Sequence, residues 1–309
     1  MQTPYLSFED YQQIMANSPL PAPQKALVMY HHAWGAMVTD PRCMTVPVDD
    51  HLVHRGDGVF ETLLFEGGAV YNLEAHLKRL EASSAAIGLE VPLAKGALTS
   101  VIRDCFELAG LDRALGRILV GRGQGGFSVD PAECEKASLY MIVYQAPPPF
   151  MVRYPEGAKA ILSQTPPKAG KLSTIKTCNY IPNALMKAEA NAAGVHFALG
   201  VDGDGYLTES ATENLAGIRE DGAFLIPPCV QHLPGTTLKR VSELAQSSGR
   251  EVLEIKLKPE DLFALSEVLI VGTTAYVSRV VELDGRPLPT GPVAGQLAEL
   301  LLKDIYQNA

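Results

Sequence analysis

A run of three prolines divides the chain into two parts of similar length. Pro147, Pro148 and Pro149 follow a strand-like segment at 139–144, and prolines in this position favour an extended, semi-rigid connector. Segments typical of strands and helices lie on both sides, and 309 residues suffice for about two domains that each bury a core. We therefore predict an α/β or α+β fold with two domains. The expected ranges are 1–145 for the first domain, including an extension at 1–26, 146–153 for the linker and 154–309 for the second domain.

Lys176 lies just before a predicted helix of the second domain. Asn179 can cap this helix, Pro182 suits its first turn and Gly194 can end it. Apolar residues recur within it at intervals of three to four and predict a buried face formed by Ile181, Leu185, Ala188 and Ala192. The lysine should therefore be anchored on a short connector beside the core.

A hairpin is predicted to bring Glu209 back toward Lys176. A strand-like stretch at 196–201 leads into a turn at 202–205, and a second run from residue 206 carries the glutamate. A lysine that can form a Schiff base and an acid that can pair with a pyridinium nitrogen are the minimum requirements for holding pyridoxal phosphate. Each residue alone is also typical of a solvated surface charge, because the chain contains 26 Lys+Arg and 35 Asp+Glu. Further motifs must therefore decide whether these two residues belong to a cofactor site or are surface charges.

Two Gly-Thr segments have the features of phosphate-binding loops. Gly235-Thr236-Thr237 precedes an amphipathic helix, and a helix N-terminus offers an anion free N–H groups and a favourable dipole. Gly272-Thr273-Thr274 follows the apolar strand 268–271, where a turn can point successive amides at an anion. Either segment alone is also an ordinary turn. Together with the lysine and the glutamate, the two segments indicate a site for a phosphate monoester.

Several separated motifs occur in an order that resembles the class IV pyridoxal-phosphate aminotransferases. This family includes D-amino-acid transaminases, branched-chain aminotransferases and aminodeoxychorismate lyases. The similarity extends from about Met29 to Val280. The motifs are a substrate-side segment at 49–62 (DDHLVHRGDGVFET), a phosphate-arginine helix at 72–80 (NLEAHLKRL), the lysine and glutamate segments at 175–180 and 207–214, and the two loops at 233–237 (LPGTT) and 271–275 (VGTTA).

The resemblance implies a fold, a cofactor and roles for individual residues. It implies two domains with pyridoxal 5′-phosphate between them, Lys176 as the Schiff-base lysine, Glu209 as the pyridinium partner and Tyr180 beside the cofactor ring. Arg79 is implied as a phosphate ligand, and a guanidinium suits that role because it makes forked contacts to phosphate oxygens. On its own, Arg79 is also consistent with a solvent-facing residue. Further implied cofactor contacts are Asn214, Thr236, Thr237, Thr273 and Thr274, and a homodimer is implied whose partner chain completes the pocket.

A glycine-rich segment at 121–126 lies near two arginines that have a predicted role in substrate binding. It formally fits the dinucleotide-binding fingerprint, but residues 127–131 continue a loop where the fingerprint requires a helix. We interpret the segment as a flexible loop at the entrance of the cofactor pocket. Arg117 and Arg122 are then candidate receptors for a substrate carboxylate. Arg55 and Phe60 of the substrate-side segment are further predicted substrate contacts.

The composition agrees with a metabolic enzyme of the cytoplasm. The formal net charge of −9 and the pI near 5.3 argue against nucleic acid or an anionic membrane as the main ligand, and no apolar run approaches the length of a membrane-spanning helix. The five cysteines are odd in number and include no CxxC pair, which indicates reduced thiols. His51 and His54 form a close pair without a third ligand at zinc-site spacing, so we predict no metal site.

The expected reaction is transamination between an amino acid and a 2-keto acid, with a D-amino acid favoured over a branched-chain L-amino acid. Glu61-Thr62-Leu63-Leu64 departs from the Glu-Gly-Ile-Arg pattern of branched-chain enzymes, and Arg55 stands where many relatives carry an aromatic residue. Tyr276 replaces the glutamate that often follows the second phosphate loop. Cleavage of 4-amino-4-deoxychorismate to 4-aminobenzoate and pyruvate is the close alternative, because the same lysine serves both reactions. A branched-chain aminotransferase and a noncatalytic ligand-binding relative are the further alternatives.

Overall fold

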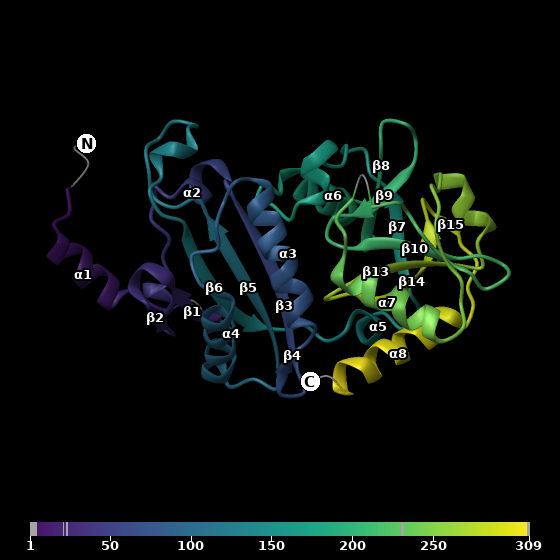
Figure 1. Cartoon of the computed structure of the whole chain (residues 1–309), viewed down its shortest axis with the longest axis horizontal. Coiled ribbons are helices and arrows are strands. Elements are labelled where there is room, and N and C mark those ends of the chain that lie inside the picture. Colours follow the sequence, from purple (N-terminus) through teal and green to yellow (C-terminus); the bar gives the residue numbers. More distant parts are fainter. Residues whose placement is uncertain (1–4, 21, 23, 230–231, 308–309) are drawn as a thin grey trace.

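Two β-sheets with their helices make up the structure (Figure 1). The computed structural model describes residues 5–20, 22, 24–229 and 232–307. Strands β1 to β6 form the first sheet and β7 to β15 the second, so the chain crosses between the sheets after Gln145 and before Ala158. The predicted mixed fold with two domains is confirmed, whereas the domain limits themselves stay a prediction. The connector is not extended throughout, because Phe150–Arg153 forms the short helix α5 and buries Phe150.

The first sheet is antiparallel and has the strand order β2-β1-β6-β5-β3-β4. Its strands are β1 (Ala26–His31), β2 (Ala36–Val38), β3 (Gly58–Glu66), β4 (Ala69–Val70), β5 (Arg113–Gly121) and β6 (Ser138–Gln145). Gly58 lets β3 and β5 approach closely, because a Cβ atom there would lie 2.6 Å from the carbonyl oxygen of Val120. The long central strands therefore form a rigid support for the residues that they carry.

Two helices cover one face of this sheet, α3 (Leu73–Ala86) and α4 (Lys95–Ala109). Leu77 and Leu80 of α3 pack with Ile102 and Phe106 of α4 in a core shared with alternate strand residues. Helix α3 thus turns an apolar stripe toward the sheet and ends at Ala86, two residues before Gly88. The stripe also contains the buried polar residue His76, one turn before Arg79.

The second sheet follows the order β12-β11-β10-β13-β14-β7-β8-β9, and β9 also pairs with β10, which closes part of the sheet on itself. An apolar core fills this closed sheet and contains Leu199, Leu215, Val268 and Val280. The strands are β7 (Ala158–Leu162), β8 (Phe197–Val201), β9 (Leu207–Ser210), β10 (Asn214–Ile218), β11 (Phe224–Ile226), β12 (Val252–Glu254), β13 (Glu267–Gly272), β14 (Tyr276–Leu283) and β15 (Arg286–Pro287). The predicted hairpin that carries Glu209 is β8 and β9.

Helices α7 (Thr236–Ser247) and α8 (Val293–Gln307) pack together against the second sheet. Their apolar residues share one core with Leu64 and Leu115, which lie on the face of the first sheet that α3 and α4 leave uncovered. In Figure 1, α8 runs along the second sheet toward β4, so that its last turn lies between the two sheets. This common core fixes the two domains against each other.

Helix α6 (Ile181–Ala192) shows that the predicted apolar face was wrong. Ile181 and Leu185 are 69% and 51% exposed, and the helix instead buries Asn183, Met186 and Ala190. Both sides of this helix carry apolar residues, so spacing alone does not identify the inner one. The N-cap is Tyr180 rather than Asn179, and no side chain caps the helix.

The remaining elements lie at the outer end of the first domain or in connecting segments. Helix α1 (Phe8–Asn17) begins with a capping box at Ser7, buries no residue and projects from the molecule in Figure 1. It lies within the predicted extension 1–26, of which residues 1–4, 21 and 23 are outside the described residues. The other short helices are α2 (His51–Arg55), η1 (His32–Trp34), η2 (Pro41–Cys43), η3 (Pro131–Glu133), η4 (Gly170–Thr174) and η5 (Pro259–Ala264). Within the described ranges, no helix is long and apolar enough to cross a membrane.

Candidate active site

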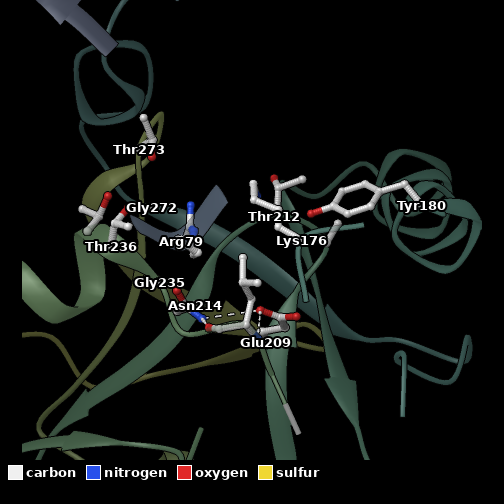
Figure 2. Close-up of a pocket in the computed structure, with 13 residues that line it drawn as sticks. Arg79, Lys176, Tyr180, Glu209, Thr212, Asn214, Gly235, Thr236, Gly272 and Thr273 are labelled. Carbon is white, nitrogen blue, oxygen red and sulfur yellow. Dashed lines mark hydrogen bonds between the residues drawn. The ribbon is translucent and has the colours of Figure 1, made fainter. Parts of the chain in front are cut away.

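A cavity between the two domains collects most of the predicted cofactor residues. Its empty space, including the open solvent at its mouth, is about 390 Å³. Figure 2 shows Thr236, Gly272 and Thr273 at one end, Tyr180 at the other, and Arg79 and Glu209 between them. The lining residues are Arg79, Lys176, Tyr180, Glu209, Ala211, Thr212, Asn214, Leu233, Gly235, Thr236, Thr237, Gly272 and Thr273. Of the predicted cofactor contacts, Thr274 is not among the lining residues.

Lys176 is held in place by the first domain. Its carbonyl oxygen accepts a hydrogen bond from the N–H of Phe60 at 2.9 Å, and the N–H of Cys178 donates to the carbonyl of Gly58 at 2.8 Å. Thr177 forms an isolated bridge with Val59, so the connector runs alongside the start of β3. The backbone around the lysine is therefore fixed while its side chain enters the cavity.

The amine of Lys176 is buried without an acidic partner. Its Nζ lies 4.6 Å from the ring centroid of Phe60 and 5.9 Å from that of Tyr180, and no hydrogen bond joins it to another described residue. Burial, followed by the positive charge of Arg79, lowers the pKa of Lys176 to about 8. An amine with this pKa is partly neutral near physiological pH and can act as a nucleophile or a base.

Glu209 faces the cavity from β9 with one carboxylate oxygen already engaged. Its Oε2 accepts hydrogen bonds from the N–H of Leu233 at 3.2 Å and from Nδ2 of Asn214 at 3.4 Å. No described residue donates to Oε1. Burial raises the pKa of Glu209 to about 7, against the opposing effects of His232 and the Leu233 hydrogen bond. A ligand that brings a positively charged N–H group would satisfy the free oxygen.

Arg79 is positioned by two buried residues that the sequence motifs did not single out. Its Nε and Nη2 donate to the two oxygens of Glu61 at 2.7 and 2.8 Å, and Nδ1 of His76 lies 2.8 Å from the same carboxylate. Burial alone would raise the pKa of Glu61, but the hydrogen bonds and charges of Arg79 and His76 outweigh it and lower the pKa to about 2. Nη1 of Arg79 donates to the carbonyl of Pro234 at 3.1 Å, next to the first phosphate loop. Arg79 is thus a cavity residue and not a solvent-facing one.

The two predicted phosphate loops meet at the same end of the cavity. Gly235 is the N-cap of α7 and no side chain caps that helix, so the first N–H groups of α7 are left for a ligand. A Cβ atom at Gly235 would lie 1.9 Å from Oδ1 of Asn214, so the close approach requires glycine. Gly272 and Thr273 face this helix start from the end of β13. Helix amides, a second loop and Arg79 form a donor set that fits a phosphate group.

The structure separates the four predicted substrate residues. Phe60 lies beside Lys176, and the guanidinium of Arg117 lies 5.3 Å from the centroid of the same ring. Arg122 does not line the cavity: it forms a two-pronged ion pair with Asp57 at 2.9 and 3.0 Å and donates to two backbone carbonyls. Arg55 donates to the carbonyls of residues 54, 127 and 128. Phe60 thus lies next to Lys176 with Arg117 against it, although neither is among the lining residues, and Arg122 and Arg55 are held elsewhere.

The glycine-rich segment does not lie at the cavity as predicted, whereas the cysteines are free thiols as predicted. The backbone of Gly123 and Gly125 is hydrogen-bonded to residues 51 and 49, and neither glycine lines the cavity. All five cysteines are free, and burial raises the pKa of Cys178 to about 12, which makes it a packed thiol and not a nucleophile. Among the described residues, no group of three or more His, Cys, Asp or Glu side chains is arranged to hold a metal ion.

Comparison with known proteins agrees with this geometry. The family model for amino-transferase class IV matches residues 58–283. The chloroplastic D-amino-acid transaminase of Arabidopsis thaliana is 32% identical over 291 residues, which cover 91% of this chain and 77% of that protein. A bifunctional aminodeoxychorismate lyase / D-amino acid transaminase of Mycobacterium tuberculosis is 29% identical over 281 residues, which cover 85% of this chain and 94% of that protein. The branched-chain amino acid aminotransferase of T.th., complexed with N-(5′-phosphopyridoxyl)-L-glutamate, superimposes with a TM-score of 0.85 at 28% identity over 92% of this chain and 96% of that one.

The chain therefore belongs to the class IV aminotransferase family and is a pyridoxal-phosphate-dependent enzyme. Its substrates belong to the amino acids and keto acids. The cavity fits the cofactor in three respects. Lys176 supplies an unpaired buried amine, Glu209 supplies a carboxylate with a free oxygen, and the two loops form a phosphate cradle at the end opposite Tyr180.

Proposed function

We propose that this enzyme transfers the amino group of an amino acid to a 2-keto acid and prefers D-amino acids. The observation that carries the proposal is the buried, unpaired amine of Lys176 in one cavity with Glu209 and the phosphate cradle. Such an arrangement suits the transfer of a proton from one carbon atom to another, which is what amino-group exchange requires. The D-amino-acid preference is supported by the Arabidopsis relative and by the departure of Thr62-Leu63-Leu64 from the branched-chain pattern.

The residues of the cavity would hold the cofactor at three points. Arg79, the first amides of α7 with Thr236 and Thr237, and the loop at Gly272 and Thr273 would bind its phosphate. Oε1 of Glu209 would accept the N–H of the pyridine ring, and Tyr180 would lie beside the ring. Asn214 would act through Glu209, because its Nδ2 donates to the carboxylate. When bound, pyridoxal phosphate withdraws electrons from the bond between Cα and its hydrogen.

Lys176 would move the proton. Because burial lowers its pKa to about 8, a fraction of the amine is neutral at physiological pH and can take a proton from Cα of the substrate. The same Nζ can later donate this proton to the second carbon atom of the exchange. The aromatic rings of Phe60 and Tyr180 restrict water around this atom, which keeps the proton between substrate and lysine.

Arg117 would receive the substrate carboxylate. Its guanidinium is exposed, lies against the rings of Phe60 and Tyr144, and makes no ion pair within the described part of the chain. By contrast, Arg122 and Arg113 are paired with Asp57 and Glu66. A guanidinium without an acidic partner next to Phe60 is therefore the cationic group best placed to orient an amino acid over Lys176.

Cleavage of 4-amino-4-deoxychorismate is the second candidate, favoured by the bifunctional relative of Mycobacterium tuberculosis. Three assays separate the alternatives: D-alanine with 2-oxoglutarate, L-leucine with 2-oxoglutarate, and 4-amino-4-deoxychorismate without an amino acceptor. We expect the first to give the fastest turnover. Lys176→Ala is the control, since it should slow all three reactions by at least about 10²-fold. Turnover of the chorismate derivative alone would refute transamination, and a preference for L-leucine would refute the stereochemical part.

The active form is proposed to be a homodimer. Apolar side chains are exposed on two segments: Phe127 and Val129 are 65% and 81% exposed, and Ile181 and Leu185 lie uncovered on α6. Burial of such residues against a second copy would stabilise an assembly and enclose the substrate. Light scattering over a dilution series, combined with activity measurements, tests this. A fully active monomer would contradict it.

A cytoplasmic location is a further part of the proposal and is supported by the five free cysteines. The relative from Arabidopsis thaliana is described as chloroplastic, so organelles are the alternative location. Cell fractionation followed by immunoblotting distinguishes them. Recovery in an organelle fraction would refute the cytoplasmic assignment.

A further inference from the structure

Tyr276 occupies an unusual position directly after the second phosphate loop. Residues 273–275 connect β13 to β14, and Tyr276 pairs with Gly272 across this tight connection. Its φ angle is +57°, in the left-handed region that non-glycine residues rarely adopt. Its side chain is only 5% exposed and does not line the cavity. A large aromatic residue keeps such a backbone conformation only where its surroundings impose it.

The hydroxyl group of Tyr276 is held by two residues of the first domain. It donates to Oε2 of Glu66 at 2.7 Å and accepts from Nη2 of Arg113 at 2.9 Å. The guanidinium of Arg113 also lies 5.7 Å from the centroid of the tyrosine ring. Burial and then the hydrogen bond to Glu66 raise the pKa of Tyr276 above its usual range, so the hydroxyl stays a donor at physiological pH.

Glu66 and Arg113 are themselves fixed from several sides. Nε of Arg113 lies 3.3 Å from Oε2 of Glu66, its Nη1 donates to the carbonyl of Pro147, and Tyr306 of α8 donates to Oε1 of Glu66 at 2.9 Å. Glu66 ends β3 and Arg113 begins β5, and these two strands also carry Phe60 and Arg117. Tyr276 thus joins the phosphate loop to the strands that carry the proposed substrate residues.

We propose that Tyr276 is a positioning residue for the cofactor phosphate: Glu66 and Arg113 hold its side chain, and through it they hold the loop at 272–274 against the anion. The proposal rests on the binding of pyridoxal phosphate in the cavity. The hydroxyl of Tyr276 touches neither cofactor nor substrate, and its effect passes through the backbone of the preceding loop. Tyr276 therefore takes part in phosphate binding by a route that differs from direct contact.

Two ligands that differ only in the phosphate test this role. Apoprotein is titrated with pyridoxal 5′-phosphate and with pyridoxal, and the dissociation constants are measured by fluorescence. Tyr276→Phe removes both hydrogen bonds of the hydroxyl group, to Glu66 and from Arg113, and should weaken pyridoxal-phosphate binding by roughly tenfold while it leaves pyridoxal binding unchanged. Tyr306→Phe is the matched control, because it removes a hydroxyl from the same Glu66 without touching the loop. The control should change neither constant by more than about twofold.

Glu66→Gln is the second variant, since it alters the clamp without altering Tyr276. It should weaken pyridoxal-phosphate binding selectively, as Tyr276→Phe does, while circular dichroism shows a native fold. Equal weakening of both ligands would overturn the proposal, because it would mark general loosening between the domains. An unchanged constant for pyridoxal phosphate, or an equal effect of Tyr306→Phe, would overturn it as well. Wild-type protein that fails to bind pyridoxal phosphate would refute the cofactor site itself and this proposal with it.

Discussion

Replacement of Glu209 by glutamine is expected to stabilise the cofactor-free enzyme at alkaline pH while it weakens cofactor binding. The carboxylate is partly buried, two weak donors reach Oε2, and no described residue donates to Oε1. An ionised carboxylate in this environment is poorly solvated. Glutamine has the same shape and can keep the contacts of the side-chain oxygen without carrying a charge.

The size of the effect follows from the pKa of Glu209, which rises from its ordinary value of 4.5 to about 7 in the folded protein. Below pH 4.5 the group is protonated in both the folded and the unfolded state, and its contribution to stability is fully present. Between pH 4.5 and 7 the folded state keeps a proton that the unfolded state releases, so the free energy of unfolding falls as the pH rises. Above pH 7 the contribution is lost, and the loss amounts to about 3 kcal/mol.

Urea unfolding of the apoproteins at about pH 5 and about pH 8.5 measures this contribution. The wild-type protein should lose about 3 kcal/mol more stability between these two pH values than Glu209→Gln. Glu213→Gln is the control, because it makes the same chemical change next to the same hairpin, where Glu213 accepts a hydrogen bond from the N–H of Thr212. Equal pH dependence in wild type and Glu209→Gln would refute the reasoning. Tight binding of pyridoxal phosphate to Glu209→Gln would refute the assigned pairing with the ring nitrogen.

Three further substitutions test individual residues. Lys176→Ala should slow amino transfer by about 10²-fold to 10⁴-fold through loss of the base alone. In peptide mapping after borohydride reduction, the cofactor should no longer be attached to the peptide that contains residue 176. Arg79→Lys should weaken pyridoxal-phosphate binding roughly tenfold in equilibrium titration, because lysine cannot replace the forked guanidinium group that Glu61 now positions. Unchanged affinity would contradict a contact between Arg79 and the phosphate. Arg122→Ala should leave kcat/KM unchanged and lower stability in urea by about 1 kcal/mol, because its ion pair with Asp57 lies away from the cavity. A raised KM for this variant would instead restore Arg122 as a substrate residue.

The extent to which the sequence predicts the fold is well illustrated by two helices. For α3, one apolar stripe opposes a charged face, so Leu77 and Leu80 identify the buried side correctly. For α6, apolar residues occur on both sides of the helix, and the exposed pair Ile181 and Leu185 is as apolar as the buried side. Which side faces the core depends on the position of the helix on its sheet, and this is set by residues distant in the sequence.

The structure brings together the predicted site residues whose type the chemistry dictates, and it separates those that long-range pairing holds elsewhere. A phosphate cradle and a buried amine have recognisable local patterns, and the structure brings these segments together. The pairing of Arg122 with Asp57 joins residues 65 positions apart, and no local pattern announces it. Glu61 did have a usable signal: strand alternation places it on the same buried face as Val59 and Leu63. A carboxylate at such a position requires a cationic partner, which is Arg79.

Helix α8 has a consequence for how the enzyme acquires its cofactor during synthesis. It supplies Asp304 to Arg240 of α7 and to Tyr71 before α3, so it ties together elements that carry the phosphate cradle. During translation the N-terminal parts of a protein emerge and fold first, and residues 293–307 follow every residue that lines the cavity. The cradle therefore lacks these ties until α8 has left the ribosome. Capture of pyridoxal phosphate should follow the emergence of α8, and interrupted chains that lack α8 should not sequester the cofactor from the cell.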